Sequence, residues 1–164
     1  MKFLLLLLTL VASEVCAQTT QLVASRPLCA SQLDTLAQRH RYTWLVIWAP
    51  GCGPWEQLAD SYQKFITQHA ERDIQLVLVA VQYAPHNTST ILTRLRFTSP
   101  TYFVDSIRYA KSGSQGFQRE LNKTIKGRKY RHANHYIYER GKGVIYTSDV
   151  PEADFVRLKT VFRI

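Results

Sequence analysis

Two short apolar runs restrict the folds that are open to this chain. Residues 44–49 (WLVIWA) and 74–81 (IQLVLVAV) have the length and the nearly unbroken apolar character of strands covered on both faces. Between them, an apolar stripe at helical spacing begins at Trp55 and predicts an amphipathic helix, with Pro54 suited to its first turn. Buried strands joined by a helix are typical of parallel pairs, so the pattern predicts an α/β fold with helices on both faces of the sheet.

The rest of the chain extends this sheet and makes it mixed. Residues 135–138 and 144–147 flank Gly141-Lys142-Gly143, a hairpin signature that predicts two antiparallel strands. Periodicity predicts the remaining elements, which are helices at 28–39, 89–97, 117–125 and 151–162 and a short strand at 101–104. The 164 residues allow one domain of ordinary size, and a hydrophobic content of 46% excludes a wholly disordered chain.

The first residues have the pattern of a signal peptide. A lysine at position 2 precedes an apolar run of ten residues, 3–12, and Val15-Cys16-Ala17 offers a cleavage site. Ten apolar residues are too few to span a bilayer, which needs about 20. We therefore expect residues 1–17 to be removed and residues 18–164 to form the domain of a periplasmic or secreted protein, with no transmembrane segment after cleavage. An uncleaved N-terminal anchor is the alternative.

Removal of the leader would leave Cys29 and Cys52 as the only cysteines, and they form no Cys-x-x-Cys pair. Two cysteines are too few for a zinc ribbon or a cysteine-rich scaffold. His132 and His135 have a spacing that metal sites use, but three cationic residues stand beside them and disfavour a metal ion: Arg128, Lys129 and Arg131. We expect neither a metal site nor a cofactor.

Residues 48–55 (WAPGCGPW) end a predicted strand and open a predicted helix. This run resembles the thioredoxin active-site run, Trp-Ala-x-Trp-Cys-Gly-Pro-Cys, and the order of elements resembles that of the thioredoxin-like superfamily over most of residues 25–164. The resemblance implies a thioredoxin-like three-layer α/β fold and partners that are protein or peptide thiols and disulfides. It assigns Cys52 as the catalytic nucleophile. It also assigns five motif residues to the binding groove: Trp48, Pro50, Gly53, Pro54 and Trp55.

Three positions depart from the thioredoxin pattern. Trp55 replaces the second, resolving cysteine, so no disulfide can form within the motif. Gly51 replaces the usual tryptophan. Val46 stands where many thioredoxins keep a buried acid that aids proton transfer.

The cis-proline that the family places beside the active cysteine is also missing. Counting back from the glycines at 141 and 143 places that position near Asn134, and no proline occurs from residue 101 to 150. Asn134 is therefore counted among the binding residues. A competing alignment uses Pro100 instead, but it leaves some 50 residues after a nearly finished fold.

Two classes of function remain open from the sequence. A thiol at a helix N-terminus is favoured as thiolate, so Cys52 could form mixed disulfides as a monothiol, with a second thiol required for release. If active, the protein would thus be a thiol-disulfide oxidoreductase-like enzyme. The alternative is a redox-inactive binding module that uses the groove near Cys52 and Asn134. Cys29 is either a small core residue or a remote resolving partner of Cys52.

A peroxidase with Gln82 as polar partner is disfavoured. The Trp-Asn pair of thioredoxin-like glutathione peroxidases appears here only as Ala133-Asn134.

Positive charge is concentrated in one segment. Residues 107–142 contain ten Lys and Arg against two acids, Glu120 and Glu139, and this net +8 is most of the formal charge of +9. Such a segment is either a solvated surface or a site for an acidic or anionic partner. An exported protein without a recognition motif is a poor candidate for a nucleic-acid partner.

Overall fold

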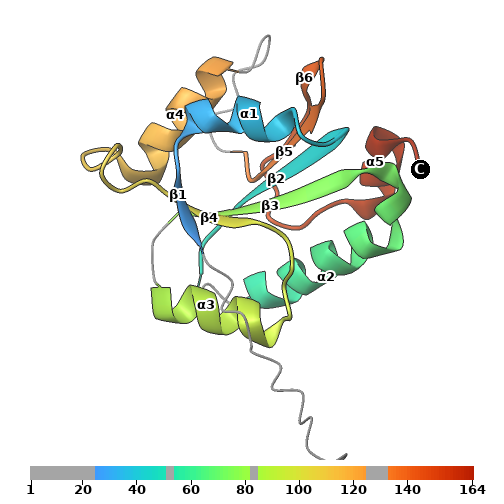
Figure 1. The fold of residues 1–164 in the computed structure, drawn as a ribbon, viewed down its shortest axis with the longest axis horizontal. Helices are drawn as coiled ribbons and strands as arrows, with labels where there is room; N and C mark the ends of the chain where they lie inside the picture. Colours follow the sequence, from blue (N-terminus) through green and yellow to red (C-terminus); the bar gives the residue numbers. More distant parts are fainter. Residues whose placement is uncertain (1–24, 51–53, 82–84, 125–132) are drawn as a thin grey trace, which may run out of the picture.

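The structure, a computed structural model, describes residues 25–50, 54–81, 85–124 and 133–164 (Figure 1). In chain order the described elements are β1 (Arg26–Leu28), the 3-10 helix η1 (Ala30–Gln32), α1 (Leu33–Ala37), β2 (Tyr42–Trp48), α2 (Trp55–Gln68), the 3-10 helix η2 (Ala70–Arg72), β3 (Ile74–Ala80), α3 (Pro85–Arg94), β4 (Thr101–Val104), α4 (Gly113–Thr124), β5 (His135–Glu139), β6 (Gly143–Ser148) and α5 (Phe155–Phe162).

The strands form a mixed, six-stranded sheet in the order β1-β4-β3-β2-β5-β6. The first four of these run parallel, whereas β5 is antiparallel to β2 and β6 is antiparallel to β5. All seven residues of β2 are buried, as expected for a central strand covered on both faces. The predicted hairpin is confirmed as β5–β6, with Gly141 and Gly143 at positive φ in its turn.

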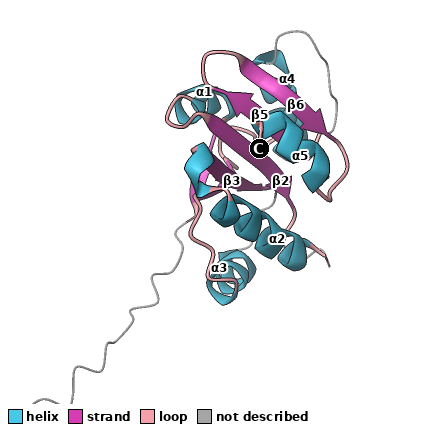
Figure 2. Ribbon diagram, turned by 90° about the vertical axis from the view of Figure 1, so that its right-hand side faces the viewer, coloured by secondary structure: helices cyan, strands magenta, loops and turns pink. Residues whose placement is uncertain are grey.

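Two apolar clusters lie on opposite faces of the sheet, and alternate residues of β2 divide between them. Leu45 and Ile47 pack with residues of α1 and α4, whereas Trp44 and Trp48 pack with residues of α2, α3 and α5. Figure 2 shows the sheet between these helical layers. The α/β class with helices on both faces of a mixed sheet is therefore confirmed.

The N-terminal part of the described chain differs from the prediction. A continuous helix was expected over residues 28–39, but Leu28 ends β1 and the true α-helix is only α1. The backbone of Cys29 is extended (φ −98°, ψ 150°), so the helical segment starts only after it, at η1. The leucine and alanine residues of this range are buried, but Leu28 is buried as part of a strand and not of a helix.

The predicted leader, residues 1–17, lies outside the described residues. Within the part of the chain that the structure describes, no helix has both the length and the apolar character needed to cross a membrane.

Candidate functional site

The loop after β2 is framed by two well-defined ends. Strand β2 ends at Trp48 in the middle of the sheet, and α2 begins at Trp55 with Pro54 as its N-cap residue. The carbonyl of Pro54 accepts a hydrogen bond from the Leu58 amide at 3.1 Å, which closes the first helical turn. Between these ends, Gly51, Cys52 and Gly53 lie outside the described residues.

The other predicted groove residues of this loop differ in exposure. Trp48 is only 2% exposed, and its carbonyl accepts a hydrogen bond from the Val81 amide at 2.8 Å. Pro50 is half-buried and Pro54 is exposed. Trp55 is half-buried and packs against the cluster on the α2 face of the sheet, so it carries the first contact of the helix with the core.

Asn134 lies beside the end of β2. Its carbonyl accepts a hydrogen bond from the Ile47 amide, its amide donates to the carbonyl of Ser148, and both N···O distances are 2.8 Å. Its side-chain Nδ2 donates to the carbonyl of Asp149 at 2.6 Å. Asn134 thus joins β2 to the segment after β6, and the peptide bond that precedes it is trans, like the others in the described chain.

The competing alignment through Pro100 does not fit the sheet. Pro100 leads into β4, which runs parallel to β3 on the side away from β2. The antiparallel neighbour of β2 is β5, which begins directly after Asn134. Asn134 is therefore the residue that directly precedes the antiparallel neighbour of β2.

A buried polar cluster below Asn134 was not predicted. His135 accepts a hydrogen bond at Nδ1 from Trp44 Nε1 (3.2 Å), and its Nε2 lies 2.8 Å from the carbonyl of Pro151. The hydroxyl of Tyr62 donates to the same carbonyl at 2.7 Å. These partners assign a neutral imidazole with its proton on Nε2. Burial lowers the pKa of His135 and raises the pKa of Tyr62.

The pairing of histidines considered from the sequence has no support here, because His132 lies outside the described residues and His135 is occupied by Trp44 and Pro151. Among the described residues, no group of three or more His, Cys, Asp or Glu side chains could hold a metal ion.

Val46 is fully buried and pairs in register with His135 across the β2–β5 ladder. Its cluster neighbours are apolar and aromatic, among them Trp44 and Trp48. Hence this chain has no carboxylate at the position where the thioredoxin pattern has its buried acid. The nearest titratable group in the ladder is the neutral His135.

Cys29 follows β1 and is half-buried with a free thiol. Its Sγ donates a hydrogen bond to Asp105 Oδ2 at 3.5 Å, and its amide donates to Gln32 Oε1 at 2.9 Å. Burial, followed by the hydrogen bond and negative charge of Asp105, raises the pKa of this thiol and favours its protonated form.

The sheet order also separates Cys29 from the β2 end. Strands β4 and β3 lie between β1 and β2, and three spacings of about 4.8 Å amount to about 14 Å. A disulfide requires Cα atoms within about 7 Å.

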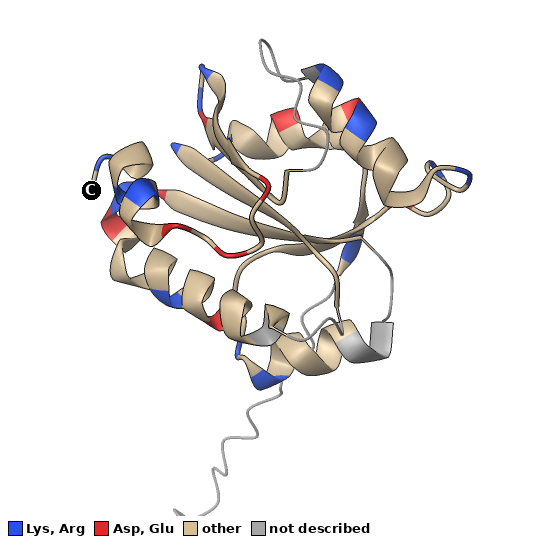
Figure 3. Ribbon diagram, turned by 180° about the vertical axis from the view of Figure 1, so that it is seen from behind, with Lys and Arg blue, Asp and Glu red and all other residues tan. Residues whose placement is uncertain are grey.

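Some of the cations in the basic segment, 107–142, form ion pairs with acids of the same segment. Arg108 makes two contacts with Glu120, from Nη2 to Oε1 at 2.8 Å and from Nε to Oε2 at 3.3 Å, and Lys142 Nζ lies 2.9 Å from Glu139 Oε1. Other cations of the segment are exposed: Lys111, Arg119, Lys123 and Arg140. Figure 3 shows the Lys and Arg of the described ribbon spread over several elements, α4 and the hairpin among them. The remaining four basic residues of the segment lie outside the described chain.

No protein-family model matches the chain, and no curated protein matches it in sequence. Among solved structures, 83 chains are similar. A thiol:disulfide interchange protein of the thioredoxin family from Chlorobium tepidum has a TM-score of 0.57 at 15% identity, covering 77% of this chain and 83% of that one. The thioredoxin domain of a thiol-disulfide oxidoreductase from Bacteroides vulgatus has a TM-score of 0.56 at 8% identity, with the same coverage of 77% and 83%.

A third similar structure is a secreted disulfide oxidoreductase from Mycobacterium tuberculosis. Its TM-score is 0.53 at 12% identity, covering 78% of this chain and 84% of that one. At identities this low, the likeness establishes the fold alone. Together with the sheet order, it confirms the thioredoxin-like fold that residues 48–55 implied.

Proposed function

We propose that this thioredoxin-fold chain is an exported thiol-disulfide protein that acts through Cys52 alone and is not a dithiol oxidoreductase. The observation that carries the proposal is the position of the Cys52 loop between the end of β2 and the start of α2. Cys52 stands in the chain four residues after the end of the central strand β2 and three residues before the first residue of the 14-residue helix α2. Two structural neighbours, one named as a thiol-disulfide oxidoreductase and one as a thiol:disulfide interchange protein, support the thiol-disulfide part of this proposal.

The proposed chemistry is thiol–disulfide exchange. The positive end of the α2 dipole and free amide groups favour the Cys52 thiolate. The thiolate attacks one sulfur of a partner disulfide, a Cys52–partner disulfide forms, and the partner's other sulfur leaves as thiolate. Because Trp55 stands where the resolving cysteine would be, release requires a second thiol from the partner or from a small thiol. Cys29 is a poor candidate, since its environment favours the protonated thiol.

Six residues are proposed to bind the partner around Cys52. Pro50, Gly53, Pro54 and Trp55 belong to the loop and the start of α2, and Asn134 lies beside the end of β2. Trp48 is the buried last residue of β2, so its part would be to support the groove from the core. The contact between Asn134 and Ile47 supports this grouping, because it fixes Asn134 beside the end of β2.

Alkylation at several pH values, read by peptide mapping and mass spectrometry of the purified exported protein, tests the proposal. We expect Cys52 to react near neutral pH, well ahead of Cys29, because the helix end lowers one pKa and burial with Asp105 raises the other. The same peptides from unreduced protein test a Cys29–Cys52 bridge. A Cys52 that stays unreactive until the protein unfolds would exclude the monothiol mechanism.

The alternative is a redox-inactive binding module with the same groove, and Trp55 favours it. This side chain packs on the core where an active dithiol protein would have its second cysteine. In that case peptide binding should persist in Cys52→Ser, whereas the monothiol mechanism predicts that covalent capture of disulfide partners is lost in this variant.

Export and an acidic or anionic partner of segment 107–142 complete the proposal. The apolar leader in residues 1–17 and the secreted M. tuberculosis neighbour support export. The exposed cations Lys111, Arg119 and Lys123 support an electrostatic partner surface. N-terminal sequencing of the exported protein, expected to begin at Gln18, tests the first point.

A further inference from the structure

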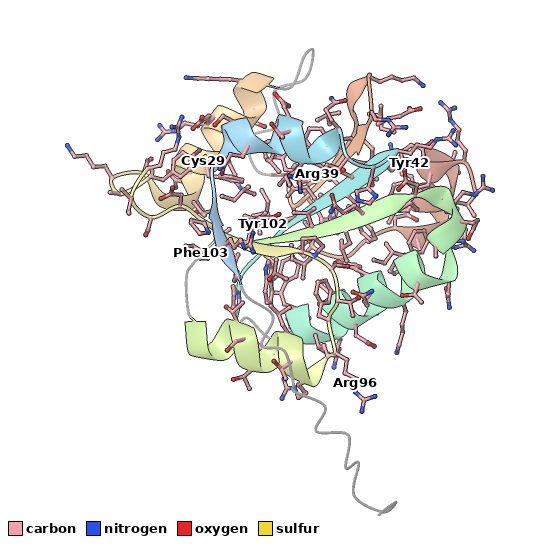
Figure 4. All side chains as sticks on the ribbon, viewed as in Figure 1. Cys29, Arg39, Tyr42, Arg96, Tyr102 and Phe103 are labelled. Atoms are coloured by element: carbon pink, nitrogen blue, oxygen red, sulfur yellow. The ribbon has the colours of Figure 1, made fainter. Side chains whose placement is uncertain are left out.

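A groove of about 380 Å³ lies between α1 and the edge strand β1, on the face of the sheet opposite α2. We call it the α1–β1 groove. Its sheet side is formed by β1 and by Tyr102 of β4, and its helix side by η1, α1 and the residues just after α1. Figure 4 labels Arg39 just below α1 and Tyr102 beside β4.

The sheet side of the groove combines a cation with an apolar floor. Arg26 pairs in register with Tyr102, so the two side chains stand next to each other on the same face of the sheet. Leu28 lies two residues further along β1 on this face and is buried in the core beneath the groove. Tyr102 is half-buried against the same core, which leaves part of its surface to the groove.

The helix side presents polar groups at helical spacing. Gln32 of η1, Thr35 of α1 and Arg39, two residues after α1, follow one another at i, i+3 and i+7, and all three line the groove. All three side chains are exposed. The Oε1 atom of Gln32 accepts the Cys29 amide, so its Nε2 group remains as the donor toward the groove.

The groove is rich in donors and has no acid in its described lining. Arg26 and Arg39 are exposed, and their guanidinium groups make no ion pair or hydrogen bond with the described residues. No Asp or Glu is found among the described lining residues. Two unpaired guanidinium groups, one amide NH2 and two hydroxyl groups therefore surround the space. Guanidinium groups bind planar or tetrahedral oxyanions through paired hydrogen bonds.

We propose that the α1–β1 groove binds a small organic oxyanion, a phosphate monoester or a carboxylate with an apolar body. The oxyanion group lies between Arg26 and Arg39, with Gln32 and Thr35 as further donors. The apolar body covers the Tyr102 ring. This groove is separate from the end of β2, because its edge strand β1 is divided from β2 by β4 and β3.

Titration with phenyl phosphate and benzoate, followed by calorimetry and by NMR of the mature protein, tests the site and identifies the preferred oxyanion. Arg39→Gln and Arg26→Gln should each weaken binding of the preferred probe roughly tenfold to a hundredfold, the effect of one lost charged hydrogen-bonding group. Tyr102→Leu should abolish the preference for phenyl phosphate over inorganic phosphate. Benzyl alcohol, which lacks the charge, should not bind.

Arg119→Gln is the matched control, because it removes one exposed positive charge from α4 and leaves the groove intact. It should change the affinity less than twofold, which is within the range of long-range charge effects. If Arg119→Gln weakened binding as much as the groove variants, the effect would come from net charge and the proposal would be overturned. The absence of binding at millimolar concentrations of the probes would also overturn it. Cys52→Ser should leave binding unchanged, so the result does not depend on the thiol chemistry proposed above.

Discussion

At the scale of single residues, the buried His135 is the titratable group that lies next to Asn134 in the candidate site. Trp44 donates to its Nδ1 and Pro151 accepts from its Nε2, so a second proton would have to displace the Trp44 contact. A protonated imidazole here would also be a charge buried among aromatic rings, those of Trp44 and Tyr62 among them. The cluster therefore favours the neutral form.

We expect the free energy of unfolding to fall as the pH drops below about 6.5, the ordinary pKa of histidine. Burial lowers the pKa of His135 in the folded protein, so the unfolded chain takes up the proton first and is stabilised relative to the folded state. Each pH unit below about 6.5 should cost about 1.4 kcal/mol until the folded pKa is reached. Urea unfolding between about pH 7.5 and about pH 5.5 measures this loss.

The control for this prediction is His135→Gln, which keeps a donor and an acceptor but does not titrate. Its stability should vary less over the same range of pH. The same pH dependence in both proteins would assign the effect to other groups.

Single residues of the site differ in how far the sequence could predict them. The place of Asn134 just before β5 follows from counting back from the hairpin, because glycine turns fix strand register locally. The contact of His135 with Trp44 joins positions 91 residues apart, and no local pattern indicates it. Arg26 and Arg39 were equally hidden, because their common groove depends on the way β1 pairs with β4.

At the scale of elements, the short edge strand shows where periodicity fails. β1 has three residues, of which Arg26 and Pro27 are exposed, and it pairs only with β4. A strand of three residues is too short to show an alternation of apolar and polar residues. Pro27 has no N–H to donate to the sheet, and a proline is tolerated in an edge strand for this reason. The buried central strands β2 and β3 were predicted because burial on both faces leaves an apolar run in the sequence itself.

The start of α5 yields a prediction about helix capping. A helix was predicted over 151–162, but α5 begins only at Phe155 and Asp154 is its N-cap residue, with Oδ1 accepting from the Arg157 amide at 3.0 Å. Asp154→Ala should lower the free energy of unfolding by about 1 kcal/mol, the usual cost of a lost cap. Thermal or urea unfolding measures it.

Glu152→Ala is the comparison for the cap, since it removes the same charge from an exposed position just before the helix. It should change stability by less than about 0.5 kcal/mol, as surface substitutions usually do. Equal losses in the two variants would mean that charge near the helix end matters and that the hydrogen bond does not.

At the scale of the whole molecule, the fold is retained while the groups that drive dithiol exchange are absent. The sheet order places Asn134 beside the end of β2, as a thioredoxin-like arrangement requires. Yet Val46 has no proton to exchange, and Trp55 contributes packing in place of a thiol. His135 cannot substitute as a base, because its free lone pair already accepts from Trp44. Under the proposed monothiol function, the departures from the dithiol pattern therefore involve several positions and not the second cysteine alone.

Repair of the motif by Trp55→Cys tests whether the resolving cysteine alone is missing. We expect the Cys-Gly-Pro-Cys disulfide to form, but turnover of a disulfide substrate with a small thiol should stay about a hundredfold or more below that of an ordinary thioredoxin. A positioned proton acceptor contributes about 10²–10⁴-fold, and Val46 offers none for the new thiol. Trp55 is only half-buried, so its loss should cost less than the about 3–5 kcal/mol of a fully buried tryptophan.

Two further variants separate the missing functions, and Trp55→Ser controls for the lost packing without adding a thiol. Trp55→Cys with Val46→Asp should raise turnover above the single variant, at a cost in stability because position 46 is fully buried. Adding Asn134→Pro restores the proline of the family pattern but removes the amide that donates to Ser148, so we expect a further loss of stability. If Trp55→Cys alone matched an ordinary thioredoxin, the substitutions at 46 and 134 would be irrelevant to exchange, and only one cysteine would separate this chain from a dithiol enzyme.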